Sequence, residues 1–209
     1  GDVYRQMDRP ADADAFYQRA LALTPAGASQ ADLLRALMEM ALVRGEVAQA
    51  RAWHQRLIAS QPGSASVRRE LAESLLARRM YPEAITEYQS LARALAGDNR
   101  VLPPVLRDMG RAQMRAGQLD EALVTLRRAL GLAWADAGIR RELYDDMTEL
   151  RTQRHELEAW IAELEREGNA TYERVMLLGR LHAEQGHADD AIRAYRRAAA
   201  LRPNDVDAQ

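Results

Sequence analysis

The same arrangement of residues returns along this chain about every 34 positions. A small residue marks each return, at Ala13, Ala50, Ala84, Ala122, Ala159 and Ala191. The interval drifts from 32 residues (Ala159 to Ala191) to 38 residues (Ala84 to Ala122), as happens when equal helical units are joined by loops of different length. A repeat of this length predicts pairs of helices, each packed against the next pair along the chain.

The last copy of the pattern, which begins at Tyr172, is the clearest. Counted from that residue, positions 4, 7, 8, 11, 20, 24, 27 and 32 hold Val175, Leu178, Gly179, His182, Ala191, Tyr195, Ala198 and Pro203. This pattern resembles the tetratricopeptide repeat (TPR). The resemblance implies an all-α fold, a right-handed superhelical solenoid of antiparallel helix pairs.

The repeat positions divide the chain into a half repeat and five full repeats, expected to form a single solenoid. The half repeat covers residues 1–30, and the full repeats cover residues 31–64, 65–102, 103–139, 140–171 and 172–203. The copy at 140–171 is the weakest, because Glu163 and Arg166 stand where an aromatic and a small residue are usual. The pattern starts partway through a repeat and runs on past the last copy. We therefore expect a fragment of a longer protein.

Glycine marks the turn inside several of the predicted helix pairs. Gly45, Gly117 and Gly186 all stand at position 15 of their repeats. Because glycine readily adopts the left-handed conformation, it commonly ends a helix. The sequence therefore predicts that the first helix of these repeats stops there and the second begins directly afterwards.

The charge composition limits the classes of partner. The chain has 29 basic residues, all of them arginine, against 31 acidic ones, for a net charge of −2. It lacks the basic excess expected of a nucleic-acid binder, and it has no long uncharged apolar run that would insert into a membrane. Cysteine is absent, which leaves both the cytoplasm and the periplasm open.

No catalytic or cofactor-binding motif is present. The glycine-rich phosphate-binding patterns, the HExxH zinc motif and the GxSxG nucleophile motif are all missing. His155 and Glu156 lack the second histidine of a zinc-protease helix. His182 and His187 flank a predicted helix end, and we interpret them as packing residues. The sequence predicts neither an enzyme nor a metal site nor a cofactor.

The resemblance implies that the first helix of each repeat lines a concave groove. Carried over position by position, the groove residues we predict are Arg35, Arg69, Arg107, Arg111, Arg115, Arg141, Tyr144, Arg151 and Arg180. Arginine stands at position 5 of three successive repeats, and on the helix after residue 103 it forms a stripe with a spacing of four residues. Such unpaired guanidinium groups suit carboxylates or phosphates.

A second interpretation of these arginines stays open. Arg35 with Glu39, and Arg69 with Glu73, are spaced as i,i+4 pairs that neutralise each other on a solvated helix face. TPR domains that clamp the carboxylate end of a chaperone tail use lysine and asparagine at particular groove positions. Those residues are missing here, so that clamp is not predicted.

The function we predict is a protein-interaction scaffold. Its groove would bind a segment of a protein or peptide with acidic character, without nucleic acid. An alternative is the recognition arm of a larger enzyme or of a periplasmic polysaccharide-secretion or envelope machine. Self-association through incomplete terminal repeats is a third possibility.

Overall fold

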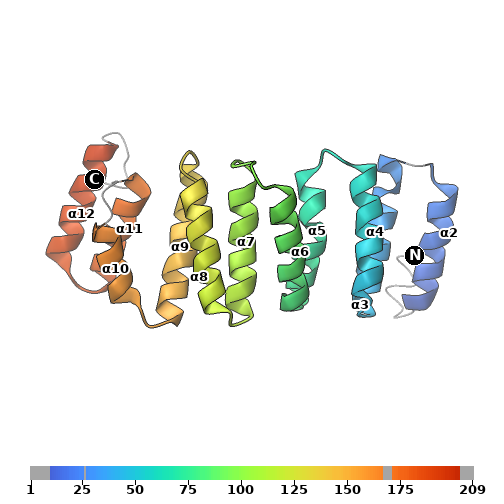
Figure 1. Ribbon diagram of the computed structural model, residues 1–209, viewed down its shortest axis with the longest axis horizontal. Coiled ribbons are helices and arrows are strands. Elements are labelled where there is room, and N and C mark those ends of the chain that lie inside the picture. Colours follow the sequence, from blue (N-terminus) through green and yellow to red (C-terminus); the bar gives the residue numbers. More distant parts are fainter. Residues whose placement is uncertain (1–9, 26, 167–170, 203–209) are drawn as a thin grey trace. The chain divides into compact units, whose positions relative to one another are not determined.

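The computed structural model describes residues 10–25, 27–166 and 171–202. Within these residues it has eleven α-helices, one short 3-10 helix and no strand. Figure 1 shows the helices running back and forth as hairpins, so the predicted all-α class of antiparallel helix pairs is confirmed. The chain forms two compact units, residues 1–94 and residues 95–209. Pro203 and the first nine residues of the predicted half repeat lie outside the described residues.

The first unit consists of one single helix followed by two hairpins. Its elements are α2 (Pro10–Leu23), η1 (Ala28–Gln30), α3 (Ala31–Val43) with α4 (Val47–Ser60), and α5 (Ala65–Ala77) with α6 (Tyr81–Ala94). The core is largely aliphatic, and the most completely buried leucines are Leu34, Leu37, Leu57, Leu71 and Leu75. Helix α2 joins this core through Ala13, Tyr17 and Leu21.

The second unit consists of three hairpins. They are α7 (Leu102–Arg115) with α8 (Leu119–Leu132), α9 (Ala137–Gln153) with α10 (Leu157–Arg166), and α11 (Tyr172–Glu184) with α12 (Ala188–Leu201). We call the leading helix of each hairpin its first helix. In this unit the first helices α7, α9 and α11 contact one another in that order. The buried core of this unit, formed by first and second helices together, includes Leu106, Leu126, Leu143, Met147, Trp160 and Leu164.

Small residues allow the two helices of a hairpin to approach closely. Ala122 on α8 is fully buried and Ala191 on α12 is 4% exposed, as the repeat pattern predicts. The first helices α7 and α11 contribute a glycine to this contact, Gly110 and Gly179. A Cβ atom on Gly179 would lie 2.5 Å from the ring of Tyr195, a distance at which carbon atoms overlap. The large side chain on one helix therefore fills the space that the missing side chain on the other leaves.

The register predicted for α10 is wrong by one residue. Ala159, which we expected at the helix crossing, is exposed, and Trp160 is 1% exposed in its place. Helix α10 begins at Leu157, so Trp160 is its fourth residue, as Ala122 is of α8. In this register Leu164, fully buried, takes the core position that we assigned to Glu163. The copy that looked weakest thus keeps an apolar core.

All five hairpin turns share one backbone geometry. The predicted glycines Gly45, Gly117 and Gly186 have φ of +75°, +76° and +78°. Arg79 and His155 take the same place in the other two turns, with φ of +60° and +56°. In each turn the next residue donates its N–H to the carbonyl five residues earlier, at 2.8–3.0 Å. This bond caps the first helix, and it forms with or without glycine.

Enlarging a crossing residue should destabilise the second unit. We expect Ala122→Leu to lower the free energy of unfolding by about 1–3 kcal/mol, because the fully buried site has no room for three more carbon atoms. Val124→Leu on the same helix is the matched control, since Val124 is 70% exposed. Urea unfolding followed by circular dichroism measures both. Equal stability of the two variants would contradict the packing described for α7 and α8.

Candidate binding surface

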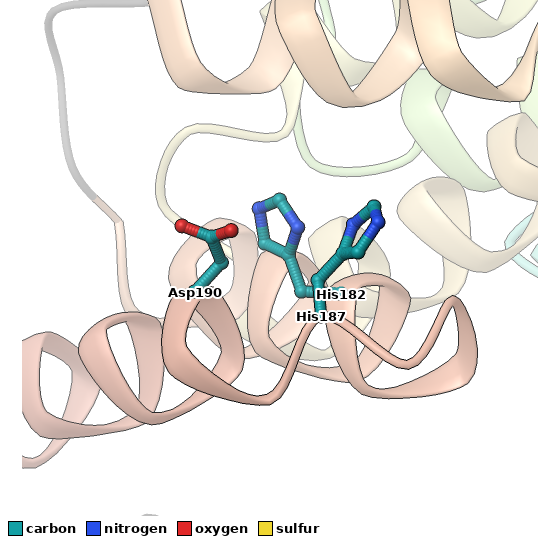
Figure 2. A group of neighbouring side chains, drawn as sticks. All are labelled: His182, His187 and Asp190. Atoms are coloured by element: carbon teal, nitrogen blue, oxygen red, sulfur yellow. The ribbon is translucent and has the colours of Figure 1, made fainter.

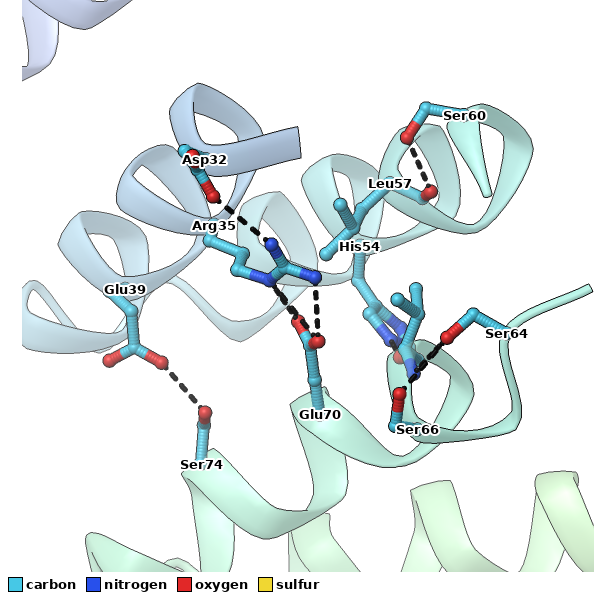
Figure 3. A network of polar contacts seen from close by, with 11 residues as sticks. Asp32, Arg35, Glu39, His54, Leu57, Ser60, Ser64, Ser66, Glu70 and Ser74 are labelled. Atoms are coloured by element: carbon cyan, nitrogen blue, oxygen red, sulfur yellow. Dashed lines mark hydrogen bonds and ion pairs between the residues drawn. The ribbon is translucent and has the colours of Figure 1, made fainter. Parts of the chain in front are cut away.

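The predicted groove arginine of α3 is bound to the next repeat. Arg35 donates from Nε to both carboxylate oxygens of Glu70 on α5, at 2.9 and 3.1 Å, and from Nη1 to Asp32 at 3.2 Å (Figure 3). The hydrogen bond to Glu70 raises the pKa of Arg35. Arg35 is therefore a neutralised link between two first helices and not an open cation.

The two predicted i,i+4 pairs have different outcomes. Arg69 donates to Glu73 at 3.0 Å, so that pair is confirmed. Glu39 instead accepts a hydrogen bond from Ser74 at 2.7 Å (Figure 3) and forms an ion pair with Arg78, so its predicted pairing with Arg35 is wrong. Both partners of Glu39 belong to the next repeat. Sequence spacing along one helix missed them because packing of the two first helices provides the nearer partners.

Arg107 makes the same kind of link in the second unit. It donates to Asp146 and to Glu142 on α9, at 2.5 Å in each case. The Asp146 side chain is only 8% exposed. Burial raises the pKa of this carboxyl, and the hydrogen bond and charge of Arg107 oppose that rise. These ion pairs link α7 to α9 and neutralise the charge of Arg107.

The rest of the basic stripe on α7 is less occupied. Arg111 lies 3.8 Å from Asp146, at the limit of an ion pair. Arg115 is exposed and forms no ion pair among the described residues. Only the far end of the predicted stripe therefore keeps open positive charge.

The one-residue register shift moves two predicted groove residues of α9 into the interior. Arg151 is 7% exposed; it binds Glu156 at 2.5 Å and Glu163 at 2.7 Å, with its guanidinium 5.6 Å from the centre of the Trp160 ring. Its prediction as an open groove residue is therefore wrong. Tyr144 is 5% exposed, yet its side chain lines a pocket.

This pocket lies between the first helices α9 and α11 and has a volume of about 230 Å³. Its lining is mainly aromatic and aliphatic, and includes Arg141, Tyr144, Tyr172, Met176, Leu177 and Tyr195. Arg180 also lines the pocket, so three of the predicted groove residues, Arg141, Tyr144 and Arg180, lie together here. Sequence reasoning missed Tyr172 and Met176. Their spacing of four residues on a first helix was the available signal, because it places both on one helix face.

The charges around the pocket are mostly neutralised. Arg180 donates to Asp145 across the two helices at 2.5 Å. Glu173, almost fully buried, binds Arg140 at 3.0 Å and Arg202 at 2.7 Å. Arg141 is exposed and has no ion pair in the part of the chain that the structure describes. The site is thus a pocket lined by tyrosine, methionine and leucine, by the ion-paired side chains of Asp145, Glu173 and Arg180, and by the exposed guanidinium of Arg141.

Three family models match the chain, and all three describe tetratricopeptide repeats. They cover residues 1–31, 41–99 and 173–205. The chain belongs to the TPR family. No curated protein matches it in sequence.

Solved structures resemble this chain over almost its whole length. BtubC from P. vanneervenii has a TM-score of 0.52 at 13% identity, over 97% of this chain and 92% of that one. The structure of Naa15/Naa10 bound to HypK-THB has a TM-score of 0.50 at 14% identity, over 99% of this chain and 31% of that one. Pseudomonas aeruginosa PilF has a TM-score of 0.48 at 18% identity, over 99% and 90%. None of the TPR helices in the described residues is long and apolar enough to cross a membrane.

Removing Arg107 should destabilise this TPR array. Arg107→Ala leaves the buried carboxylate of Asp146 without its strongest partner, and we expect a loss of about 1–3 kcal/mol in the free energy of unfolding. Arg115→Ala is the control on the same helix; its exposed side chain has no ion pair among the described residues, so we expect a change within about 0.5 kcal/mol. Urea denaturation distinguishes the two, and equal values would contradict the structural role of the link.

Proposed function

We propose that this chain is a protein-interaction scaffold that binds a peptide segment of its partner at the pocket between α9 and α11. Membership of the TPR family supports the general class, since TPR proteins bind proteins or peptides. The observation that carries the finer proposal is the pocket itself. It combines tyrosine, methionine and leucine side chains with the guanidinium of Arg141, while the other charged residues of the lining are held in ion pairs.

The size and lining of the pocket favour a side chain as the occupant. Its volume of about 230 Å³ lies below the range of about 300–1,000 Å³ that is usual for small-molecule sites. An aromatic or large aliphatic side chain of the partner would bury apolar surface against Tyr172 and Met176. Tyrosine is also common at binding hot spots, because it gives a large contact area at a small cost in conformational entropy.

The charge at the edge favours an acidic neighbour to that side chain. Arg141 can bind a carboxylate through two parallel hydrogen bonds. Arg115 adds exposed positive charge on α7, which contacts α9, and Arg111 on the same helix is a weakly paired cation. The preferred ligand is therefore a short segment with an apolar anchor beside one or more acidic residues.

A displayed library of random peptides tests this proposal, because selection from such a library does not require the natural partner. We expect selection on the wild-type chain to enrich peptides with an aromatic or aliphatic residue beside aspartate or glutamate. Met176→Glu should abolish their binding, because it places a charge in the apolar lining. Arg141→Glu should weaken it by about tenfold or more through like-charge repulsion. Fluorescence anisotropy measures each affinity.

A control variant and a second charge reversal locate the peptide. Val124→Glu changes an exposed residue that does not line the pocket, so its affinity should match the wild type. The double variant Arg111→Glu, Arg115→Glu weakens binding only if the acidic part of the peptide extends onto α7. Peptides that bind Met176→Glu as tightly as the wild type would contradict the proposed site.

A further inference from the structure

Three side chains with metal-ligating atoms meet at the turn between α11 and α12, away from the pocket. They are His182 in the last turn of α11, His187 directly before α12, and Asp190 in the first turn of α12 (Figure 2). One ligand atom of each lies within 4.8 Å of the others. The sequence led us to interpret both histidines as packing residues, and the structure places them with a carboxylate.

The hairpin turn fixes this arrangement. Gly186, with φ of +78°, reverses the chain, and the N–H of His187 donates to the carbonyl of His182 at 2.9 Å. Asp190 follows His187 by three residues, which places both at the same end of α12. The imidazole of His187 does not cap the helix. Its ring nitrogens make no hydrogen bond within the described residues, so they remain available to a ligand.

His182 has the surroundings of a metal-binding histidine. It is 8% exposed, and its Nε2 lies 3.2 Å from a carboxylate oxygen of Glu165. Because a carboxylate accepts hydrogen bonds, this contact places a proton on Nε2 and leaves Nδ1 as the atom that can offer a lone pair. Nδ1 is buried and has no hydrogen-bond partner. A carboxylate that orients one ring nitrogen while the other ligates is the usual arrangement at histidine metal sites.

We propose that His182, His187 and Asp190 bind a transition-metal ion of the zinc type. Two imidazoles and one carboxylate are donors that suit Zn²⁺, Ni²⁺ or Cu²⁺, whereas Mg²⁺ and Ca²⁺ prefer sets of oxygen atoms. Glu165 acts as a positioning residue through His182. Three protein ligands leave one position of a tetrahedral ion open.

Binding requires a modest contraction of the cluster. Zinc holds nitrogen and oxygen ligands at about 2.0–2.2 Å, so ligand atoms in a tetrahedral site lie about 3.4 Å apart. The side chains of His187 and Asp190 can move closer, since the first is exposed and the second half-exposed. One Asp190 oxygen is engaged by Arg193, whose side chain is 70% exposed. Arg193 therefore competes with the metal and can swing away into solvent.

Isothermal titration of the tag-free chain with Zn²⁺ tests the site, with Mg²⁺ as the comparison ion. We expect one Zn²⁺ per chain and no saturable heat with Mg²⁺. His187→Ala and Asp190→Ala should each weaken Zn²⁺ binding by about tenfold or more, because each removes a ligand. His155→Ala, which removes an exposed histidine from a different turn, should leave the affinity unchanged.

Two further variants separate metal binding from folding. Glu165→Ala should weaken Zn²⁺ binding by about 10–100-fold with little change in the thermal melt, since Glu165 is half-exposed. Arg193→Ala should strengthen binding by freeing Asp190. Either of two results would overturn the proposal: no saturable Zn²⁺ binding by the wild type, or equal affinity in His187→Ala.

Discussion

The close crossing of the two helices in each hairpin is the constraint on which the rest of the structure depends. In the hairpins α7–α8 and α11–α12, a buried alanine stands at the crossing on the second helix. A glycine on the first helix leaves room there for a large side chain of the second helix, Leu126 or Tyr195. This packing fixes the position of each first helix against its own second helix. It therefore also fixes which side chains face the first helix of the next hairpin in the same unit. The ion pairs between first helices, and the pocket between α9 and α11, follow from that placement.

The ion pairs show how a repeat uses its charges. Arg35 with Glu70, Arg107 with Glu142, and Arg180 with Asp145 all join residues 35 positions apart, about one repeat. In each case an arginine on one first helix forms an ion pair with an acidic residue on a neighbouring first helix. Most of the predicted groove arginines are therefore held in ion pairs within the protein. The positive charge left for a partner is confined to a few side chains such as Arg115 and Arg141.

The sequence predicted those features that one repeat determines locally. Glycine at position 15 and alanine at the crossing were found because each follows from the geometry of a single turn or contact. The error at α10 arose because Trp160 replaces the usual small residue, and neighbouring Ala159 offered a false match. That slip then misplaced Tyr144 and Arg151 on α9. The partners of Arg35 could not be predicted, because they depend on how two repeats pack together.

Both proposed binding sites include residues of α11. Tyr172 and Met176 face the pocket near its start, and His182 stands in its last turn. The two sites use different chemistry, so each can fail without the other.

The most direct test of the account is a chemical-shift map of the labelled chain during titration with a peptide selected for binding. Binding at the pocket predicts the largest changes at Arg141, Tyr172 and Met176, with small changes along α8 and α10. Changes centred on α8 and α10, with the residues of the pocket unaffected, would contradict the proposed site.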